Sequence, residues 1–216
     1  MTSVPPTSPA RTAAVQTIAT PDGPFTIVCA ANGHVLASGW TDDPDELVLR
    51  IGPHQRPTSI AAAARGESML EPAASAGLTR AASAGLTLAA AAVEAYYSGD
   101  WDAVREVPVL QPGTALQQSG WKLLRDLPAG ATMSYTEFAT ALRRPTAARA
   151  AAAVCARNAA ALFVPCHRVL RGDGSLGGFA WGTRIKQSLL ARESHPVSRT
   201  GAHTHQAPTA SGPVRA

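Results

Sequence analysis

Short runs of apolar and β-branched residues, separated by turn-forming residues, dominate the first half of the chain. Residues 25–30 and 34–40 favour two strands, and Ala31-Asn32-Gly33 between them is typical of a hairpin turn. Residues 88–97 favour a helix that Ser98-Gly99-Asp100 ends. The pattern therefore predicts a small α/β unit in this half.

Helical spacing takes over in the second half. Over residues 115–126 the apolar positions recur at helical intervals, at Leu116, Trp121 and Leu124, and the Leu-Pro-Ala-Gly run at 127–130 ends the pattern. Ser134, followed three residues later by Glu137, predicts the capping box of a second helix, which breaks at Arg144-Pro145.

Residues 146–157 predict a third helix that is almost entirely alanine. Two short helices around a tight break are typical of a helix-turn-helix, although most helical pairs bind nothing. The small side chains would let this helix approach a DNA backbone closely, with Arg149 reaching further. They would equally let it pack tightly against its neighbours, and both interpretations stay open.

The two ends and one internal stretch have a different composition. Residues 1–20 and 195–216 are rich in Ser, Thr, Pro and Ala and predict disordered tails, in which His195, His203 and His205 are incidental. Residues 73–79 are repeated at 81–87, and we interpret the Ala-rich stretch 59–90 as an expanded linker. The expected domains are residues 21–110 and 111–194.

Charge and cysteine content narrow the class of protein. The net charge of +4 is divided unevenly, because residues 111–194 carry +7 and the remainder −3. Such a segment faces a polyanion or is an ordinary solvated surface, and charge alone does not decide between them. Three cysteines without paired spacing, no signal peptide and no membrane segment predict a cytoplasmic protein with free thiols.

The residues best suited to chemistry lie between Asn158 and Val169. The sequence Pro165-Cys166-His167-Arg168-Val169 places a thiol beside an imidazole, and a nearby base or positive charge makes a thiol nucleophilic. We expect residues 162–164 to be extended before Pro165. Neighbours on an extended chain point in opposite directions, so contact between Cys166 and His167 requires a turn or a bridging water.

This pattern, with Asn158 eight residues before Cys166, resembles the O6-methylguanine-DNA methyltransferase family. The resemblance covers most of the second half, through Gln117-Gln-Ser-Gly-Trp-Lys-Leu-Leu124, Ser134-Tyr-Thr-Glu-Phe-Ala139, Ala147-Ala-Arg-Ala150, Arg171-Gly-Asp-Gly-Ser-Leu-Gly-Gly-Phe-Ala-Trp-Gly182 and Leu189-Leu-Ala-Arg-Glu193. The Arg-Gly-Asp-Gly and Trp-Gly pieces look most like the alkyltransferase domain of the adaptive-response regulator. The zinc and activator modules of that regulator are missing, so a stand-alone form is implied. The N-terminal match is weaker.

The resemblance implies an α+β fold, with a small ribonuclease-H-like α/β domain followed by a mainly helical domain that bears the helix-turn-helix. It also implies a suicide DNA-repair reaction in which Cys166 takes the alkyl group from O6-alkylguanine, and from O4-alkylthymine, after base flipping from the minor groove. The implied partner is double-stranded DNA, bound by a monomer without a cofactor.

The same resemblance assigns roles to single residues. His167 would act as a base through a water and Glu193 would orient it, so we expect the fold to favour the Cys166 thiolate. Asn158 would shape the active-site turn, and Tyr135 would donate a proton or hydrogen bond to the departing guanine. Arg149 would fill the gap left by the flipped base, with Tyr135, Ala148 and Ala152 also contacting DNA. The pocket would be lined by Val169, Phe179, Ala180 and Cys155.

Several positions depart from the family pattern. Ala159 stands where Pro is frequent, Phe179 where Tyr is frequent, and Ala180 shortens a neighbouring position. Cys29 and His34 have the spacing of two zinc ligands, but two ligands do not make a structural site, so we predict no metal. The alternatives are a Cys-His-Glu hydrolase, a non-repairing lesion-binding relative, which places another residue at position 166, and a separate N-terminal binding module.

Overall fold

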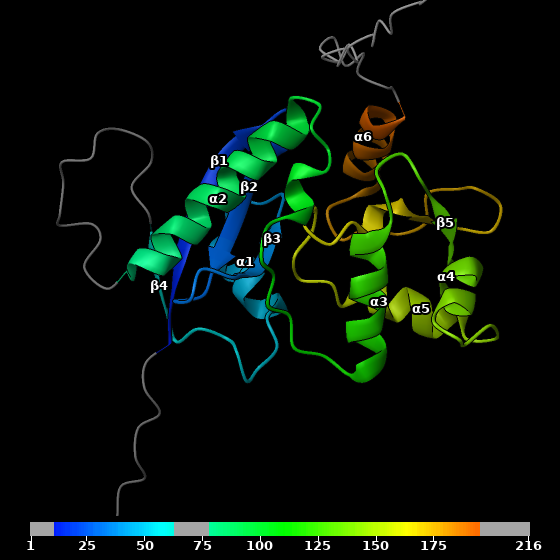
Figure 1. Cartoon of the computed structure of the whole chain (residues 1–216), viewed down its shortest axis with the longest axis horizontal. Coiled ribbons are helices and arrows are strands. Elements are labelled where there is room, and N and C mark those ends of the chain that lie inside the picture. The colour runs from blue at the N-terminus through cyan, green and yellow to red at the C-terminus, as the bar shows by residue number, and fades with distance from the viewer. Residues whose placement is uncertain (1–10, 63–77, 195–216) are drawn as a thin grey trace, which may run out of the picture.

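The computed structural model describes residues 11–62 and 78–194 and has a mixed α+β architecture (Figure 1). The N-terminal half forms a four-stranded sheet, and the C-terminal half is mainly helical. In chain order the N-terminal elements are β1 (Thr12–Thr20), β2 (Gly23–Cys29), β3 (Val35–Gly39), α1 (Pro44–Arg50), β4 (Ser59–Ala62), α2 (Arg80–Tyr97) and the one-turn helix η1 (Ala103–Arg105). The C-terminal elements are α3 (Ala115–Asp126), β5 (Met133–Ser134), α4 (Tyr135–Ala141), α5 (Ala148–Ala156), the one-turn helix η2 (Cys166–Arg168), β6 (Val169–Leu170) and α6 (Thr183–Glu193).

The sheet has the strand order β3-β2-β1-β4. β2 and β3 form the predicted antiparallel hairpin. β1 pairs with β2 in antiparallel register and with β4 in parallel register, so it is an inner strand of the sheet. The prediction of a disordered tail over residues 1–20 is therefore wrong for residues 12–20. The error arose because alanine and threonine fill β1, so its buried positions Ala13, Ala14 and Val15 give a weak apolar signal.

α2 is longer than the sequence pattern predicted and lies across one face of the sheet (Figure 1). It begins at Arg80, where the Thr79 side chain accepts a hydrogen bond from the Ala82 amide as the N-cap. The second copy of the repeat, residues 81–87, is thus helical and not a linker, which agrees with the high helix propensity of alanine. A Cβ on Gly85 would lie 2.1 Å from the Gly33 carbonyl oxygen, so only glycine permits this approach of α2 to the hairpin turn.

The C-terminal helices confirm the predicted capping pattern. α3 occupies the expected residues and has a capping box between Thr114 and Gln117. α4 has the predicted box between Ser134 and Glu137, and α5 is slightly shorter than expected, at Ala148–Ala156. One apolar cluster runs through both halves, with Phe25, Phe163, Trp121 and Leu189 among its buried members. The sheet and the helices therefore share a core.

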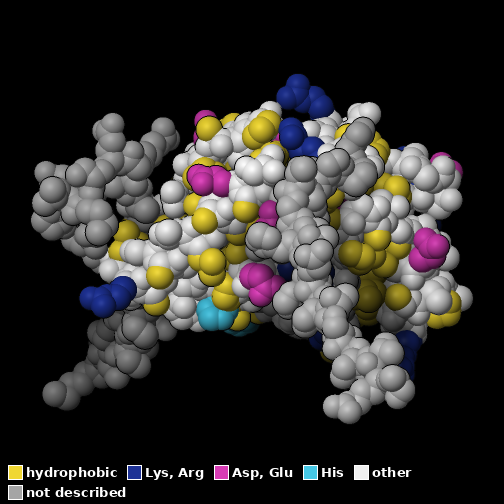
Figure 2. All heavy atoms as spheres, turned by 45° about the horizontal axis from the view of Figure 1, so that its top comes forward, with side chains coloured by type: hydrophobic (Ala, Val, Ile, Leu, Met, Phe, Trp, Pro, Cys, Tyr) yellow, Lys and Arg dark blue, Asp and Glu magenta, His cyan; other side chains and the backbone are white. Residues whose placement is uncertain are grey.

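Three other observations bear on the sequence predictions. Residues 1–10, 63–77 and 195–216, which include most of the first repeat copy and the C-terminal tail, lie outside the described residues. Within the described part, no helix is both long and apolar enough to cross a membrane. On the face drawn in Figure 2, acidic and basic side chains are scattered singly among apolar ones.

Candidate active site

Cys166 lies at the start of the one-turn helix η2. The residues before it form a turn in which Leu162 has a φ of 71°, so the expected extended approach is wrong. Pro165 restricts only the residue directly before it, and hydrogen bonds to the sheet fix the others. Because η2 is helical, Cys166 and His167 need not point in opposite directions. His167 is fully buried, whereas Cys166 is partly exposed.

Ser38 of β3 holds this turn in place. Its backbone amide donates to the Ala159 carbonyl (2.9 Å), and its carbonyl accepts from the Ala161 amide (3.2 Å). Its buried hydroxyl donates to the Ala161 carbonyl (2.8 Å). The N-terminal sheet therefore shapes the turn that carries the reactive cysteine.

Asn158 is the residue that contacts the sulfur directly. Its Nδ2 donates to Cys166 Sγ (3.2 Å) and to the Val164 carbonyl (2.8 Å), while its Oδ1 accepts from the Ala160 amide (3.2 Å). Oδ1 also accepts from Nε2 of Gln111 (3.1 Å). The structure thus places Asn158 beside Cys166, as the sequence led us to expect. It also adds Gln111, which the sequence analysis did not single out.

His167 lies in a buried ionic cluster centred on Glu193. Glu193 Oε1 accepts hydrogen bonds of 2.9 Å from His167 Nε2, Arg168 Nη2 and the Tyr96 hydroxyl. Its Oε2 accepts from Arg168 Nε (2.9 Å) and the Gly130 amide (3.3 Å). The predicted contact between His167 and Glu193 is present. Arg168 was quoted above only as part of a motif and Tyr96 was not singled out, because nothing in the sequence shows that either side chain is buried.

The electrostatics of this cluster favour an ionised Glu193 and a neutral His167. Burial alone would raise the pKa of Glu193, but hydrogen bonds and charges from His167 and Arg168 hold that pKa well below its usual range. Burial lowers the pKa of His167, against the opposing effect of Glu193. An ionised Glu193 requires that Nε2 of His167 carries the hydrogen, so Nδ1 has the free lone pair.

The Cys166 thiol is stabilised in its protonated form. Burial raises its pKa, although the hydrogen bond from Asn158 and the charges of Lys186 and Arg50 act in the opposite direction. The expectation that the fold favours the thiolate is therefore wrong. Both cations also bind backbone carbonyls, because Lys186 donates to those of Val169 and Leu176 and Arg50 donates to that of Asn158.

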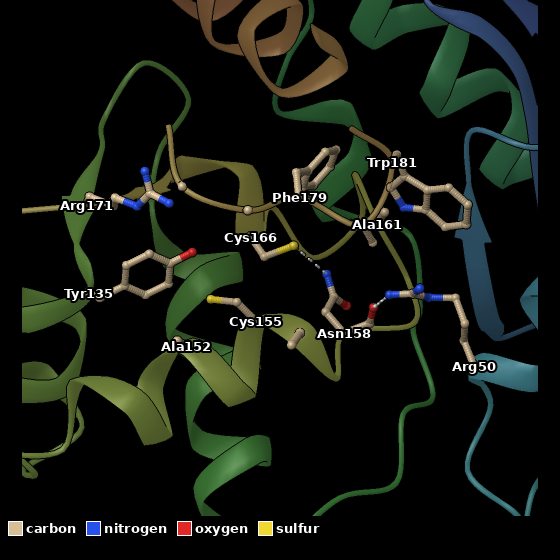
Figure 3. Close-up of a pocket in the computed structure, with 14 residues that line it drawn as sticks. Arg50, Tyr135, Ala152, Cys155, Asn158, Ala161, Cys166, Arg171, Phe179 and Trp181 are labelled. Carbon is tan, nitrogen blue, oxygen red and sulfur yellow. Dashed lines mark hydrogen bonds between the residues drawn. The ribbon is translucent and has the colours of Figure 1, made fainter. Parts of the chain in front are cut away.

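Cys166 opens into a pocket of about 500 Å³ (Figure 3). Of the predicted residues, Tyr135, Ala152, Cys155, Asn158, Phe179 and Ala180 line it together with Cys166. Val169 does not line the pocket. It is fully buried in β6, since its strand pairs with β5 and its side chain joins the core. The lining also includes Arg50, Arg171 and Trp181, which the sequence analysis did not assign to a site.

Arg149 and Ala148 lie at the N-terminal end of α5, outside the pocket lining. Arg149 is exposed, and it precedes the pocket residues Ala152 and Ala156 by three and seven residues. Residues at this spacing lie on one face of a helix, so Arg149 stands on the same face of α5 as these two pocket residues. The opposite face, with Ala151 and Val154, is buried in the core.

Comparison with known proteins agrees with the resemblance in the second half. The sequence profile described as 6-O-methylguanine DNA methyltransferase, DNA binding domain, matches residues 115–195. The chain is 46% identical over 99 residues to the Escherichia coli bifunctional transcriptional activator/DNA repair enzyme Ada, an alignment that covers 44% of this chain and 28% of that protein. The chain therefore spans little more than a quarter of this relative.

Other similarities extend into the N-terminal half. The chain is 29% identical over 178 residues to the methylated-DNA–protein-cysteine methyltransferase of Shigella flexneri, covering 82% of this chain and 94% of the relative. The structure resembles the crystal structure of Mycobacterium tuberculosis OGT in complex with DNA, with a TM-score of 0.61 and 26% identity over 84% of this chain and 92% of that one. Profile, relatives and fold agree: the chain belongs to the methylated-DNA–protein-cysteine methyltransferase family.

Proposed function

We propose that this protein repairs DNA by transferring the alkyl group of O6-alkylguanine irreversibly to Cys166. The observation that carries the proposal is the position of Cys166 in the wall of an open pocket, with Asn158 at its sulfur and the His167–Glu193 pair beside it in the chain. The pocket volume lies within the range of roughly 300–1,000 Å³ common for small-molecule sites. The names of the relatives support the same reaction.

His167 is suited to act as the base. Its Nδ1 is buried and has no hydrogen-bond partner among the described residues, whereas Nε2 faces Glu193. A buried polar atom of this kind is normally satisfied by water. We infer that one water joins Nδ1 to the Cys166 thiol and carries the proton between them.

The reaction then balances without any cofactor. The Cys166 proton passes through the water to His167 Nδ1 while the sulfur attacks the alkyl carbon. The bond between that carbon and the guanine O6 breaks, and a carbon–sulfur bond forms. Burial raises the pKa of Tyr135, so its hydroxyl keeps its hydrogen and donates a hydrogen bond to the departing base. The proton on His167 finally neutralises the restored guanine, and the thioether has no good leaving group, so Cys166 is used once.

Access to the alkylated base requires that it leave the duplex. We propose that α4 and α5 form the helix-turn-helix and enter the minor groove, with the small residues Ala148 and Ala152 allowing a close approach. Arg149 lies on the pocket side of α5 and would occupy the space of the flipped base. The same entry would serve O4-alkylthymine, and the sheet half would be the ribonuclease-H-like domain.

The charges of the C-terminal segment support attachment to phosphates. Two of its cations are internal, because Arg168 and Lys186 are buried, but the exposed set still includes Arg143, Arg144, Arg149 and Arg157 on and around α5. Phosphate contacts of this kind make binding strongly salt-dependent and nearly independent of sequence. We therefore expect a monomer that binds double-stranded DNA with little sequence preference.

Intact-protein mass spectrometry after incubation with duplex DNA containing O6-methylguanine tests the proposal. We expect one methyl adduct on a peptide that contains Cys166, and no adduct on the Cys166→Ser variant, which should still bind the duplex. Turnover without an adduct would indicate a hydrolase. Binding to the lesion with neither turnover nor an adduct would indicate a non-repairing relative. An adduct on Cys29 or Cys155 would overturn the assignment of the acceptor.

A further inference from the structure

We propose that Gln111 is a positioning residue that tunes the reactivity of the Cys166 thiol through Asn158. The inference rests on the proposed function only in taking Cys166 as the nucleophile. Gln111 lies in the segment that leads from the sheet half to α3, and its side chain is buried. It does not line the pocket into which Cys166 opens, so any effect on the sulfur must pass through other groups.

The orientation of the Gln111 amide is fixed by a backbone group. Its Oε1 accepts a hydrogen bond from the Ala159 amide (2.6 Å), and a backbone N–H can only donate. Nε2 must therefore face the other way, where it donates to Asn158 Oδ1 (3.1 Å). The two hydrogen bonds tie Gln111 to two successive residues of the active-site turn.

Asn158 passes this orientation on to the sulfur. Its Oδ1 receives hydrogen bonds from Gln111 and the Ala160 amide, and its Nδ2 donates to Cys166 Sγ. All the donors point in one direction, from the Ala159 amide through Gln111 and Asn158 to the sulfur (the final bond is drawn in Figure 3). Hydrogen bonds in such a chain polarise one another, most strongly in a buried setting. Gln111 thereby strengthens the donor that stabilises negative charge on sulfur.

The sequence offers a reason for a glutamine at this position. Ala159 stands where the family often has proline, and proline has no amide hydrogen. Alanine introduces a buried N–H that needs an acceptor. Gln111 supplies this acceptor with one atom and supports Asn158 with the other, so Gln111 and Ala159 act as a pair.

The test measures the pH dependence of Cys166 alkylation by iodoacetamide, with the modified peptide identified by mass spectrometry. This readout needs neither DNA nor alkyl transfer. Gln111→Leu removes the donor to Asn158 and should raise the midpoint of this pH profile by about half a pH unit. At any pH below the midpoint, this corresponds to a roughly threefold lower fraction of thiolate. Gln111→Glu keeps an acceptor for Ala159 but sets an anion against Asn158 Oδ1, so it should raise the midpoint by about one unit or more.

Two controls separate this effect from a general loss of structure. Gln118→Leu makes the same substitution on α3, where the amide donates, within the described part of the chain, only to the Gln111 backbone carbonyl, and should leave the midpoint unchanged. Gln111→Leu leaves the Ala159 N–H without an acceptor and should lower the Tm. Adding Ala159→Pro removes that N–H and should recover the Tm while the midpoint stays raised.

An unchanged midpoint in Gln111→Glu, or a midpoint that returns to the wild-type value in the Gln111→Leu/Ala159→Pro double variant, overturns the proposal. The proposed function fails in a different experiment, since a wild-type protein that forms no methyl adduct can still show these midpoint shifts. The two conclusions are therefore tested independently.

Discussion

The two sides of Cys166 are built from different chemistry. Toward Asn158, the neighbours are neutral amides, ordered by Gln111 and the backbone of the turn. Toward His167, the neighbours belong to an ionic cluster in which Glu193, Arg168 and Tyr96 are buried. The amide side offers one hydrogen bond to the sulfur, whereas the ionic side offers a base.

In the proposed reaction, this difference determines how the thiol is activated. Arg168 already balances the charge of Glu193, so protonation of His167 leaves a net positive charge in a buried cluster. We therefore propose that His167 is neutral at rest and accepts a proton only as the sulfur begins to bond. The raised pKa of Cys166 fits this proposal, in which the thiolate forms during the reaction and does not accumulate before it.

The largest effect is expected from Glu193→Gln. The substitution removes the only carboxylate that pairs with buried Arg168 in the described structure, and an uncompensated buried charge costs about 3–5 kcal/mol. Urea unfolding should show this loss, in addition to slower transfer. Arg168→Met combined with Glu193→Gln removes both charges and should recover most of the stability but not the transfer rate. Equal losses in the single and double variants would contradict this account.

A smaller effect is expected from Tyr96→Phe. The Tyr96 hydroxyl donates to Glu193 Oε1 inside the core, and a hydrogen bond to a charged group contributes about 1.5–3 kcal/mol. The neighbouring Tyr97→Phe is the comparison variant, because the Tyr97 hydroxyl donates to Asp22, outside the ionic cluster, and accepts from Trp40 Nε1. Urea unfolding of the two variants compares them directly. If Tyr97→Phe lowers the free energy of unfolding as much as Tyr96→Phe does, the hydrogen bond to the ionic cluster contributes no more than an ordinary one.

The ionic side should also give the protein an acid-sensitive stability. The pKa of His167 is lowered by burial from its ordinary 6.5, so below that pH the unfolded chain binds a proton that the folded protein does not. The free energy of unfolding therefore decreases as the pH is lowered below 6.5, by up to about 1.4 kcal/mol per pH unit for one proton. Glu193 has a lowered pKa as well, and its contribution is lost only below about its ordinary 4.5.

Unfolding free energies measured between pH 7 and 5 check this prediction. His167→Asn should flatten the slope in that range, and the exposed His54→Asn should not. An unchanged slope in His167→Asn would assign the acid sensitivity to other groups.

The sequence predicted the elements with strong local signals and missed those that depend on tertiary contacts. The hairpin and the capping box of Ser134 were predicted from residues close in the chain, and both are present. β1 and the start of α2 were missed because alanine does not reveal which face is buried. The turn at Leu162 depends on Ser38, more than a hundred residues away.

The residues of the candidate site likewise divide into those that the sequence identified and those that only the structure reveals. The Cys-His pair drew attention to Cys166 and His167, and the resemblance assigned roles to Asn158, Glu193 and Tyr135. Gln111 could not be identified in this manner, because a single glutamine before a helix carries no local signal for a contact with Asn158. Val169 was misplaced for the opposite reason, since its nearness to Cys166 in the chain suggested a pocket position that β6 does not provide.

The smallest effect on the thiol itself is expected from Arg149, which touches neither side of Cys166. It is exposed on the face of α5 that carries Ala152 and Ala156, so its role should appear only when DNA is present. Unstacking a base costs a few kcal/mol, roughly, and an inserted side chain offsets part of this cost. Arg149→Ala should markedly slow methyl transfer from duplex DNA while barely changing reaction with the free modified base, which needs no flipping. Arg149→Lys should recover only part of the duplex activity, because lysine keeps the charge but lacks the planar group that stacks. Single-turnover rates on both substrates decide the matter: equal losses would mean that Arg149 supports the folded pocket, and the wedge would be abandoned.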